Sequence, residues 1–204
     1  VPQDCLFTVI ERSDRGDTAR IVGSMIRYLY APDSPEAVLA VLTDERTRLV
    51  TLTITGGGYP VGEDGTFQPT DPQVRADLRH PAQPGTAFGY LTEALVRRRR
   101  AGLSGFTVLS CDNMPDNGAA ARTAVLGFAA SRDHGLATWI DAHVAFPASM
   151  VDRITPETDD AARHLVAGQF GVRDRCPVLT EPFRQWVIED RFSNGRPPLD
   201  RVGV

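Results

Sequence analysis

The central half of the chain alternates between short apolar runs and longer amphipathic stretches. Residues 48–55, "RLVTLTIT", are apolar or Thr after the first Arg, as expected of a buried strand. Residues 105–111, "GFTVLSC", predict a second strand, and residues 85–102 and 117–133 have the apolar spacing of helices, with Asn117 as the predicted N-cap of the latter. A strand, helix, strand, helix order with short joints predicts an α/β fold, a mostly parallel sheet flanked by helices.

The two ends of the chain are less regular. Residues 5–13 and 19–32 predict two strands joined by a polar turn. A helix is predicted from Pro156 onward with Thr155 as its N-cap, and residues 176–192 predict a short strand that leads into a helix or a second strand. Because no linker or repeat interrupts the pattern, we expect a single domain spanning residues 1–204.

Composition narrows the class of protein. The 204 residues are 42% hydrophobic with a net charge of -4, which is typical of a soluble globular protein and argues against a nucleic-acid partner. Neither a membrane-spanning run nor a signal pattern is apparent, and three widely spaced cysteines (Cys5, Cys111 and Cys176) do not form a disulfide framework, so we expect a cytoplasmic location. All 22 basic residues are Arg, so no lysine of this chain can act as a general base.

Polar and glycine residues follow both predicted central strands. Gly56 to Gly58 end the first, and Ser110 to Asn113 end the second. Ligands of open α/β sheets bind beyond the carboxyl ends of the strands, so these two segments are the candidate site. The amide of Asn113 could donate to a carbonyl oxygen on which negative charge develops. The alternative is that Asp112 and Asn113 cap the next helix or satisfy loop amides.

Other candidate residues carry competing interpretations. Gly56 and Gly57 would let a ligand approach the backbone, or form a plain turn, since no G-x-G-x-x-G fingerprint is present. Asp152 and Arg153 are either a site pair or a structural ion pair. Cys111 is interpreted as a small buried hydrophobe, and Arg97–Arg100 as a solvated helix end. The four histidines lack metal-ligand spacing, so no metal site is predicted.

Three longer stretches resemble one family. "FTVLSCDNMPDNG" (106–118), "VAFPASMVDRITP" (144–156) and "EPFRQWVIEDRF" (181–192) are similar to the mannitol dehydrogenase family of polyol-specific long-chain dehydrogenases. The resemblance implies a Rossmann-like domain and metal-free hydride transfer between NAD, with NADP not excluded, and a sugar alcohol or aldonate. It also implies that a small-molecule polyol or keto-sugar is the substrate and that the family's enzymes are monomers. Charge and composition add the expectation of no nucleic-acid or membrane partner.

The same resemblance assigns roles to residues. Asn113 matches the first of two asparagines that polarise the substrate carbonyl. Asp152 matches a residue at the junction of substrate and nicotinamide, and its neighbour Val151 is assigned with it to substrate or cofactor binding. Gly56, Gly57, Cys111 and Asp112 are assigned to the same binding site. The family's general base is a lysine from a helical C-terminal domain.

Three features depart from the family pattern. The glycine-rich unit that holds the cofactor pyrophosphate is expected before Val1, and the catalytic lysine after Val204. Gly56 stands where the family usually has an acidic residue. We therefore expect an incomplete Rossmann-like domain, without its first βαβ unit and its helical C-terminal domain, that is inactive alone. The alternative is a catalytically dead nucleotide-fold protein that acts as a binding or interaction module, with self-association through newly exposed surface.

Overall fold

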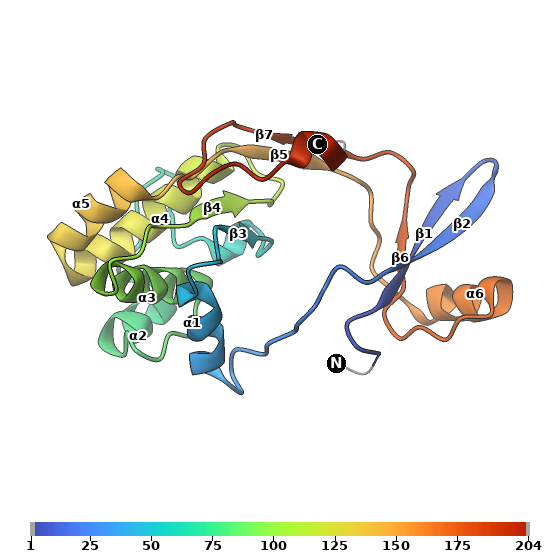
Figure 1. Ribbon diagram of the computed structural model, residues 1–204, viewed down its shortest axis with the longest axis horizontal. Helices are drawn as coiled ribbons and strands as arrows, with labels where there is room; N and C mark the ends of the chain where they lie inside the picture. The colour runs from blue at the N-terminus through green and yellow to red at the C-terminus, as the bar shows by residue number, and fades with distance from the viewer. Residues whose placement is uncertain (1–2, 203–204) are drawn as a thin grey trace. The chain divides into compact units, whose positions relative to one another are not determined.

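The computed structural model describes residues 3–202, which fold into two compact units (Figure 1). One unit contains residues 3–28 and 152–185, and the other contains residues 29–151 and 186–202. A single domain over residues 1–204 stays a prediction. No helix among the described residues is both long and apolar enough to cross a membrane.

The smaller unit is built on a three-stranded sheet. Strand β1 (Phe7–Ser13) pairs antiparallel with β2 (Gly16–Val22) and parallel with β6 (Val178–Thr180). The predicted strand over residues 19–32 is wrong beyond Val22, because β2 starts earlier and ends there. The turn between β1 and β2 is tight because Gly16 adopts a φ of +112°, which side chains rarely allow.

Helix α6 (Asp160–Phe170) completes this unit and begins later than predicted. The Asp159 carboxylate caps it by accepting a hydrogen bond from Ala162 N at 2.8 Å. The predicted N-cap at Thr155 is wrong, because α6 begins at Asp160 and the residue before Thr155 is bonded to Glu181. Ile154 N donates to Glu181 Oε1, and Ile154 O accepts from Glu181 N.

The larger unit contains the predicted pair of parallel strands. Strand β3 (Leu49–Leu52) lies parallel to β4 (Thr107–Ser110), with Leu52 opposite Ser110. Both strands are shorter than predicted, but the parallel pair with flanking helices confirms the α/β expectation. Their carboxyl ends therefore lie at the same edge of the sheet.

Five helices belong to the same unit (Figure 1). They are α1 (Pro35–Thr43), α2 (Pro72–Arg79), α3 (Ala87–Arg100), α4 (Asn117–Arg132) and α5 (His134–His143). Helix α1 packs on α3, and α4 packs on α5, α3 and β4. The core between them is apolar, with Phe88, Phe106 and Phe128 almost fully buried. This core holds the two strand ends of the candidate site in place.

The larger unit also contains most of a second pair of strands. Strand β5 (Ser149–Asp152) pairs with β7 (Gln185–Ile188), so the second of the two alternatives for residues 176–192 is correct. Val108 N donates to Ala145 O, and Glu189 N donates to Ala148 O. The segment before β5 therefore lies between β4 and the returning chain. Two short 3₁₀ turns, η1 (Gly56–Gly58) and η2 (Leu199–Val202), complete the list of elements.

The end of α3 differs from the predicted solvated run. Arg98 is only 1% exposed and donates to the carbonyl oxygens of Leu42, Asp44 and Ser104, at 2.7–3.2 Å, and its guanidinium lies 5.5 Å from the centre of the Phe106 ring. Its neighbour Arg97 pairs with Glu36 and Glu93. Arg98 therefore satisfies the carbonyl groups at the end of α1 and in the turn before β4.

Candidate functional site

The ends of β3 and β4 bring the two predicted segments together. Cys111 N donates to Leu52 O at 2.7 Å, which continues the parallel pairing one residue beyond β4. The turn that starts at Thr55 and the loop from Cys111 to Asn113 consequently lie at one edge of the sheet. The two segments predicted to form the site therefore lie together at the carboxyl ends of these strands.

Asp112 organises this edge. Its side chain is buried, and Oδ1 accepts hydrogen bonds from Ile54 N at 2.8 Å and Thr55 N at 2.7 Å. Its Oδ2 accepts from the Tyr59 hydroxyl at 2.7 Å. The alternative interpretation, in which this carboxylate satisfies loop amides, is correct for Asp112. The carboxylate is fully engaged by the protein and holds the two strand ends together.

The backbone beside Asp112 is unusual. Thr55 has a φ of +63° and a ψ of 161°, a region that residues with a side chain rarely enter. The bond to Asp112 fixes this conformation, and Gly58 N closes the following turn on Thr55 O at 3.0 Å. Gly56 and Gly57 are exposed, with no heavy atom within 4 Å of where a Cβ would lie. The turn therefore presents bare backbone to open space.

A buried hydroxyl pair supports the carboxylate. The Tyr59 hydroxyl lies 2.6 Å from Ser110 Oγ, and because its proton goes to Asp112, the Ser110 hydroxyl is the donor of that pair. Burial raises the pKa of Tyr59 well above its ordinary value, so Tyr59 stays protonated and is a hydrogen-bond donor rather than a base. Sequence reasoning missed Tyr59, because a lone Tyr after three glycines gives no periodic signal.

Asn117 joins the site to β5. It is the first residue of α4, with Asp116 as the N-cap position, so the prediction of Asn117 as the cap is wrong. Its buried side chain donates to Asp112 O at 3.1 Å and Ser149 O at 2.7 Å, and it accepts from Ser149 N at 3.0 Å. The amide therefore acts across strands rather than on its own helix.

Asn113 differs from its neighbours. It is exposed, and its side chain has no hydrogen-bond partner between residues 3 and 202. Cys111 is half-buried, and burial raises the pKa of its thiol, which agrees with its interpretation as a small hydrophobe. Of the three loop residues, only Asn113 keeps its polar group available to a ligand.

The segment from Val151 to Arg153 shows a structural ion pair. Val151 is half-buried in β5, and Asp152 is exposed and belongs to the other compact unit. Arg153 Nη2 lies 2.8 Å from Glu11 Oε1 on β1 and donates to Glu181 O. The structural alternative therefore holds for Arg153, whose carboxylate partner is Glu11. A binding role for Val151 and Asp152 stays a prediction.

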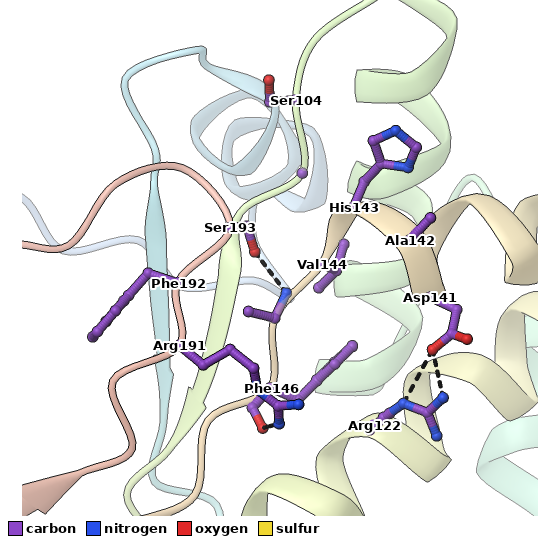
Figure 2. A pocket seen from close by; sticks show the side chains of 12 residues that line it. Ser104, Arg122, Asp141, Ala142, His143, Val144, Phe146, Arg191, Phe192 and Ser193 are labelled. Atoms are coloured by element: carbon purple, nitrogen blue, oxygen red, sulfur yellow. Dashed lines mark hydrogen bonds and ion pairs between the residues drawn. The ribbon is translucent and has the colours of Figure 1, made fainter.

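A cavity of about 630 Å³ lies elsewhere, where the chain enters β4 and leaves α5 (Figure 2). Arg122 faces Asp141 in an ion pair, Ser193 Oγ accepts from Ala145 N, and Arg191 donates to Phe146 O. These polar groups satisfy one another. None of the residues that line this cavity is a predicted site residue. They are Ser104, Gly105, Arg122, Asp141, Ala142, His143, Val144, Ala145, Phe146, Arg191, Phe192 and Ser193.

Parallel strands covered by helices, with a glycine turn and polar residues at their carboxyl ends, define a Rossmann-like α/β domain with an open sheet. A family model described as the mannitol dehydrogenase Rossmann domain matches residues 2–201, and the chain belongs to this family. The resemblance of the sequence stretches around Asn113 and Asp152 is therefore confirmed at the level of the family.

Relatives and solved structures agree with this assignment. The chain is 52% identical to a mannitol 2-dehydrogenase of Cereibacter sphaeroides, over 99% of this chain and 42% of the relative. It is 48% identical to a polyol:NADP oxidoreductase of Gluconobacter oxydans, over 99% of this chain and 42% of the relative. A Pseudomonas fluorescens mannitol 2-dehydrogenase in ternary complex with NAD and D-mannitol superposes with a TM-score of 0.94, at 48% identity, over 98% of this chain and 41% of that one. The chain thus spans about two fifths of the length of these relatives.

Proposed function

We propose that this chain is the Rossmann-like part of an NAD- or NADP-dependent oxidoreductase that interconverts a sugar alcohol or aldonate and its 2-keto sugar. The family assignment and the relatives named for mannitol and for polyol with NADP support the reaction class. Because the chain spans about two fifths of those relatives, the activity belongs to a longer parent protein. A monomeric state and a cytoplasmic location stay predictions.

The observation that carries this proposal is the contrast between Asp112 and Asn113. Asp112 is buried and bound by three donors, whereas the adjacent Asn113 amide is exposed and unbonded within residues 3–202. A fixed loop with one free amide donor suits stabilisation of a developing alkoxide, because a preorganised N–H needs no rearrangement as charge forms. We assign Asn113 that role.

The strand-end turn fits one end of a dinucleotide. Gly56 and Gly57 leave bare backbone beside open space, which suits a flat ring or its carboxamide approaching closely. The chain has no G-x-G-x-x-G turn for a pyrophosphate. We therefore assign the nicotinamide end to Gly56 and Gly57 at the strand-end turn, and the phosphate-binding turn to a part of the parent outside this chain. Binding roles for Cys111, Val151 and Asp152 stay predictions of the family resemblance.

The proton acceptor also has no candidate here. The chain has no lysine, and Tyr59 is held protonated by burial. When bound, the cofactor supplies the hydride acceptor. The residues of this chain would then orient the reacting oxygen of the substrate through Asn113, while the buried Tyr59–Asp112 pair holds the turn in place. The general base is assigned to the missing part of the parent.

An NADH titration of the chain, followed by the fluorescence of the dihydronicotinamide, tests the proposal. We expect saturable binding that weakens in G57V, whose side chain would occupy the open space beside the turn, and that N113A leaves unchanged. Both variants should keep the thermal unfolding midpoint. A folded chain that shows no saturable binding would contradict the assignment of the nicotinamide end to these residues.

A second candidate function has one observation in its favour. Residues 23–30 belong to neither helix nor strand and expose Met25, Ile26 and Tyr28, with Ile26 97% exposed. Exposed apolar runs of this kind bind other protein surfaces. A catalytically dead interaction module would therefore associate through this segment. Light scattering over a range of concentrations, with Ile26→Ser as the variant, tests this candidate: association that the variant does not reduce rules it out.

A further inference from the structure

A cavity on the smaller unit collects cationic side chains in a protein whose net charge is -4. It has a volume of about 540 Å³ and lies beside α6 and the loop that leads from α6 to β6. Arg163, His164, Arg173 and Arg175 line it, together with Gln3, Ala167 and Asp174. None of these residues belongs to the strand-end site.

The backbone under the cavity is held firmly by Asp174. This residue is buried, and its carboxylate accepts hydrogen bonds from Thr8 N, from Cys176 N at 2.9 Å and from Gln3 Nε2 at 2.7 Å. The side chain of Asp174 thus points into the protein and satisfies three donors, while the side chains on either side of it are exposed. The only acidic residue lining the cavity is therefore engaged by amide groups and does not pair with the arginines.

The three arginines differ in how they are held. Arg163 Nε donates to Arg175 O at 3.0 Å, and Arg163 also pairs with Asp160, which keeps its guanidinium against the loop. Arg173 and Arg175 are exposed and have no carboxylate within ion-pair distance among residues 3–202. Arg175 N donates to Gln3 Oε1 at 3.1 Å, so its backbone is fixed although its side chain is free.

From this arrangement we propose that the cavity is a binding site for the phosphate group of a small molecule, with Arg173 and Arg175 as its principal ligands and Arg163 as a positioned third cation. Guanidinium groups match the oxygen geometry of phosphate with paired N–H donors. Two arginines without a carboxylate partner among residues 3–202 thus line the cavity beside a loop that Asp174 and Gln3 hold in place. The cavity volume leaves room for the remainder of a phosphorylated metabolite.

Calorimetric titration of the whole chain with inorganic phosphate and with methyl phosphate, at low ionic strength, tests this site. We expect saturable binding with a dissociation constant on the order of 1 mM, which R173Q and R175Q each weaken about 10-fold by removing charged hydrogen bonds. R184Q is the matched control, because Arg184 is exposed in the same unit and does not line the cavity. This variant should bind as the native chain does.

Three outcomes would overturn the proposal. They are the absence of saturable heat with either phosphate, a loss in R184Q as large as that in R173Q, and binding of acetate as tight as that of phosphate. The last would mean that the cavity selects negative charge in general rather than phosphate. Circular dichroism of all three variants establishes that they are folded, which is expected because each substitution is on an exposed side chain. The test does not depend on NADH binding at the strand-end site.

Discussion

Adjacent side chains in the loop after β4 perform opposite tasks. Asp112 is 6% exposed and accepts hydrogen bonds from two backbone N–H groups and a tyrosine hydroxyl, while Asn113 projects outward. Asp112 is therefore a structural hydrogen-bond acceptor, and Asn113 is a hydrogen-bond donor that stays free in the described part of the chain. Its two members should respond very differently to the same substitution.

Replacing Asp112 by Ala should destabilise the chain strongly. The change removes the acceptor of the part-buried Ile54 and Thr55 N–H groups and of the buried Tyr59 hydroxyl, at a cost of about 1–3 kcal/mol. D112N should lose only about 1 kcal/mol, because its amide oxygen can still accept both bonds. Urea unfolding measures both variants. N113A is the control, with an expected change within about 0.5 kcal/mol, and equal losses in D112A and N113A would refute this account.

Asp174 should make the chain sensitive to acid. Burial by itself raises the pKa of this carboxyl, but hydrogen bonds from Gln3, Cys176 and Thr8 outweigh it and hold the pKa below its ordinary value. The ionised form therefore favours folding above the unfolded-state pKa of about 3.9, and this contribution disappears as the pH falls through the folded-state pKa. Thermal unfolding is measured at a series of pH values from about 5 downward. The unfolding temperature of D174N should fall less with decreasing pH than that of the native chain. A loss as steep as that of the native chain would exclude Asp174 as a cause.

Among the elements, the parallel pair β3–β4 and the helices α3 and α4 follow from periodicity alone. Their apolar positions repeat as a buried strand or a helix requires. The ends of elements do not follow in this way. Asp159 caps α6 in place of Thr155, and Asn117 bonds across strands, because tertiary hydrogen bonds decide between chemically similar caps. The burial of Arg98 could not be predicted from the sequence either, because no periodicity distinguishes it from the other three of four consecutive arginines.

The same limits apply to the candidate site. Sequence order placed Gly56, Gly57, Asp112 and Asn113 at one sheet edge, because consecutive parallel strands end at the same side. It did not distinguish the structural carboxylate from the free amide. That difference arises from Tyr59 and the Thr55 backbone, which reach Asp112 from 53 and 57 residues away in the sequence.

Glycines in two helices should respond in opposite directions to Ala. A Cβ at Gly118 in α4 would lie 2.7 Å from Phe146 O, whereas one at Gly168 in α6 would meet no atom within 4 Å. G118A should therefore destabilise by about 1–3 kcal/mol through overpacking. G168A should stabilise by about 0.5–1 kcal/mol through helix propensity. Chemical denaturation of the two variants decides the matter, and destabilisation by both would contradict the packing argument.

Over the whole molecule, no lysine is present to act as the general base that the family resemblance implies. We expect that the chain alone does not oxidise NADH in the presence of D-fructose, because it has no lysine and its buried Tyr59 stays protonated. An absorbance assay for NADH at high protein concentration checks this expectation. Turnover by the purified chain, abolished in N113A, would show that a base exists within these 204 residues.

The route of the chain through its two units bears on the order of folding. Ser193 forms hydrogen bonds with Ala145 and Thr107 of the larger unit, across 48 and 86 residues of sequence. Residues 152–185, which precede it in the chain, belong to the other unit. The last strand of the larger unit can dock only once that excursion has been synthesised. Doubling the length of such a loop adds only about 0.6 kcal/mol to its closure. A change in the length of this excursion would therefore add little to the free energy of closing the larger unit.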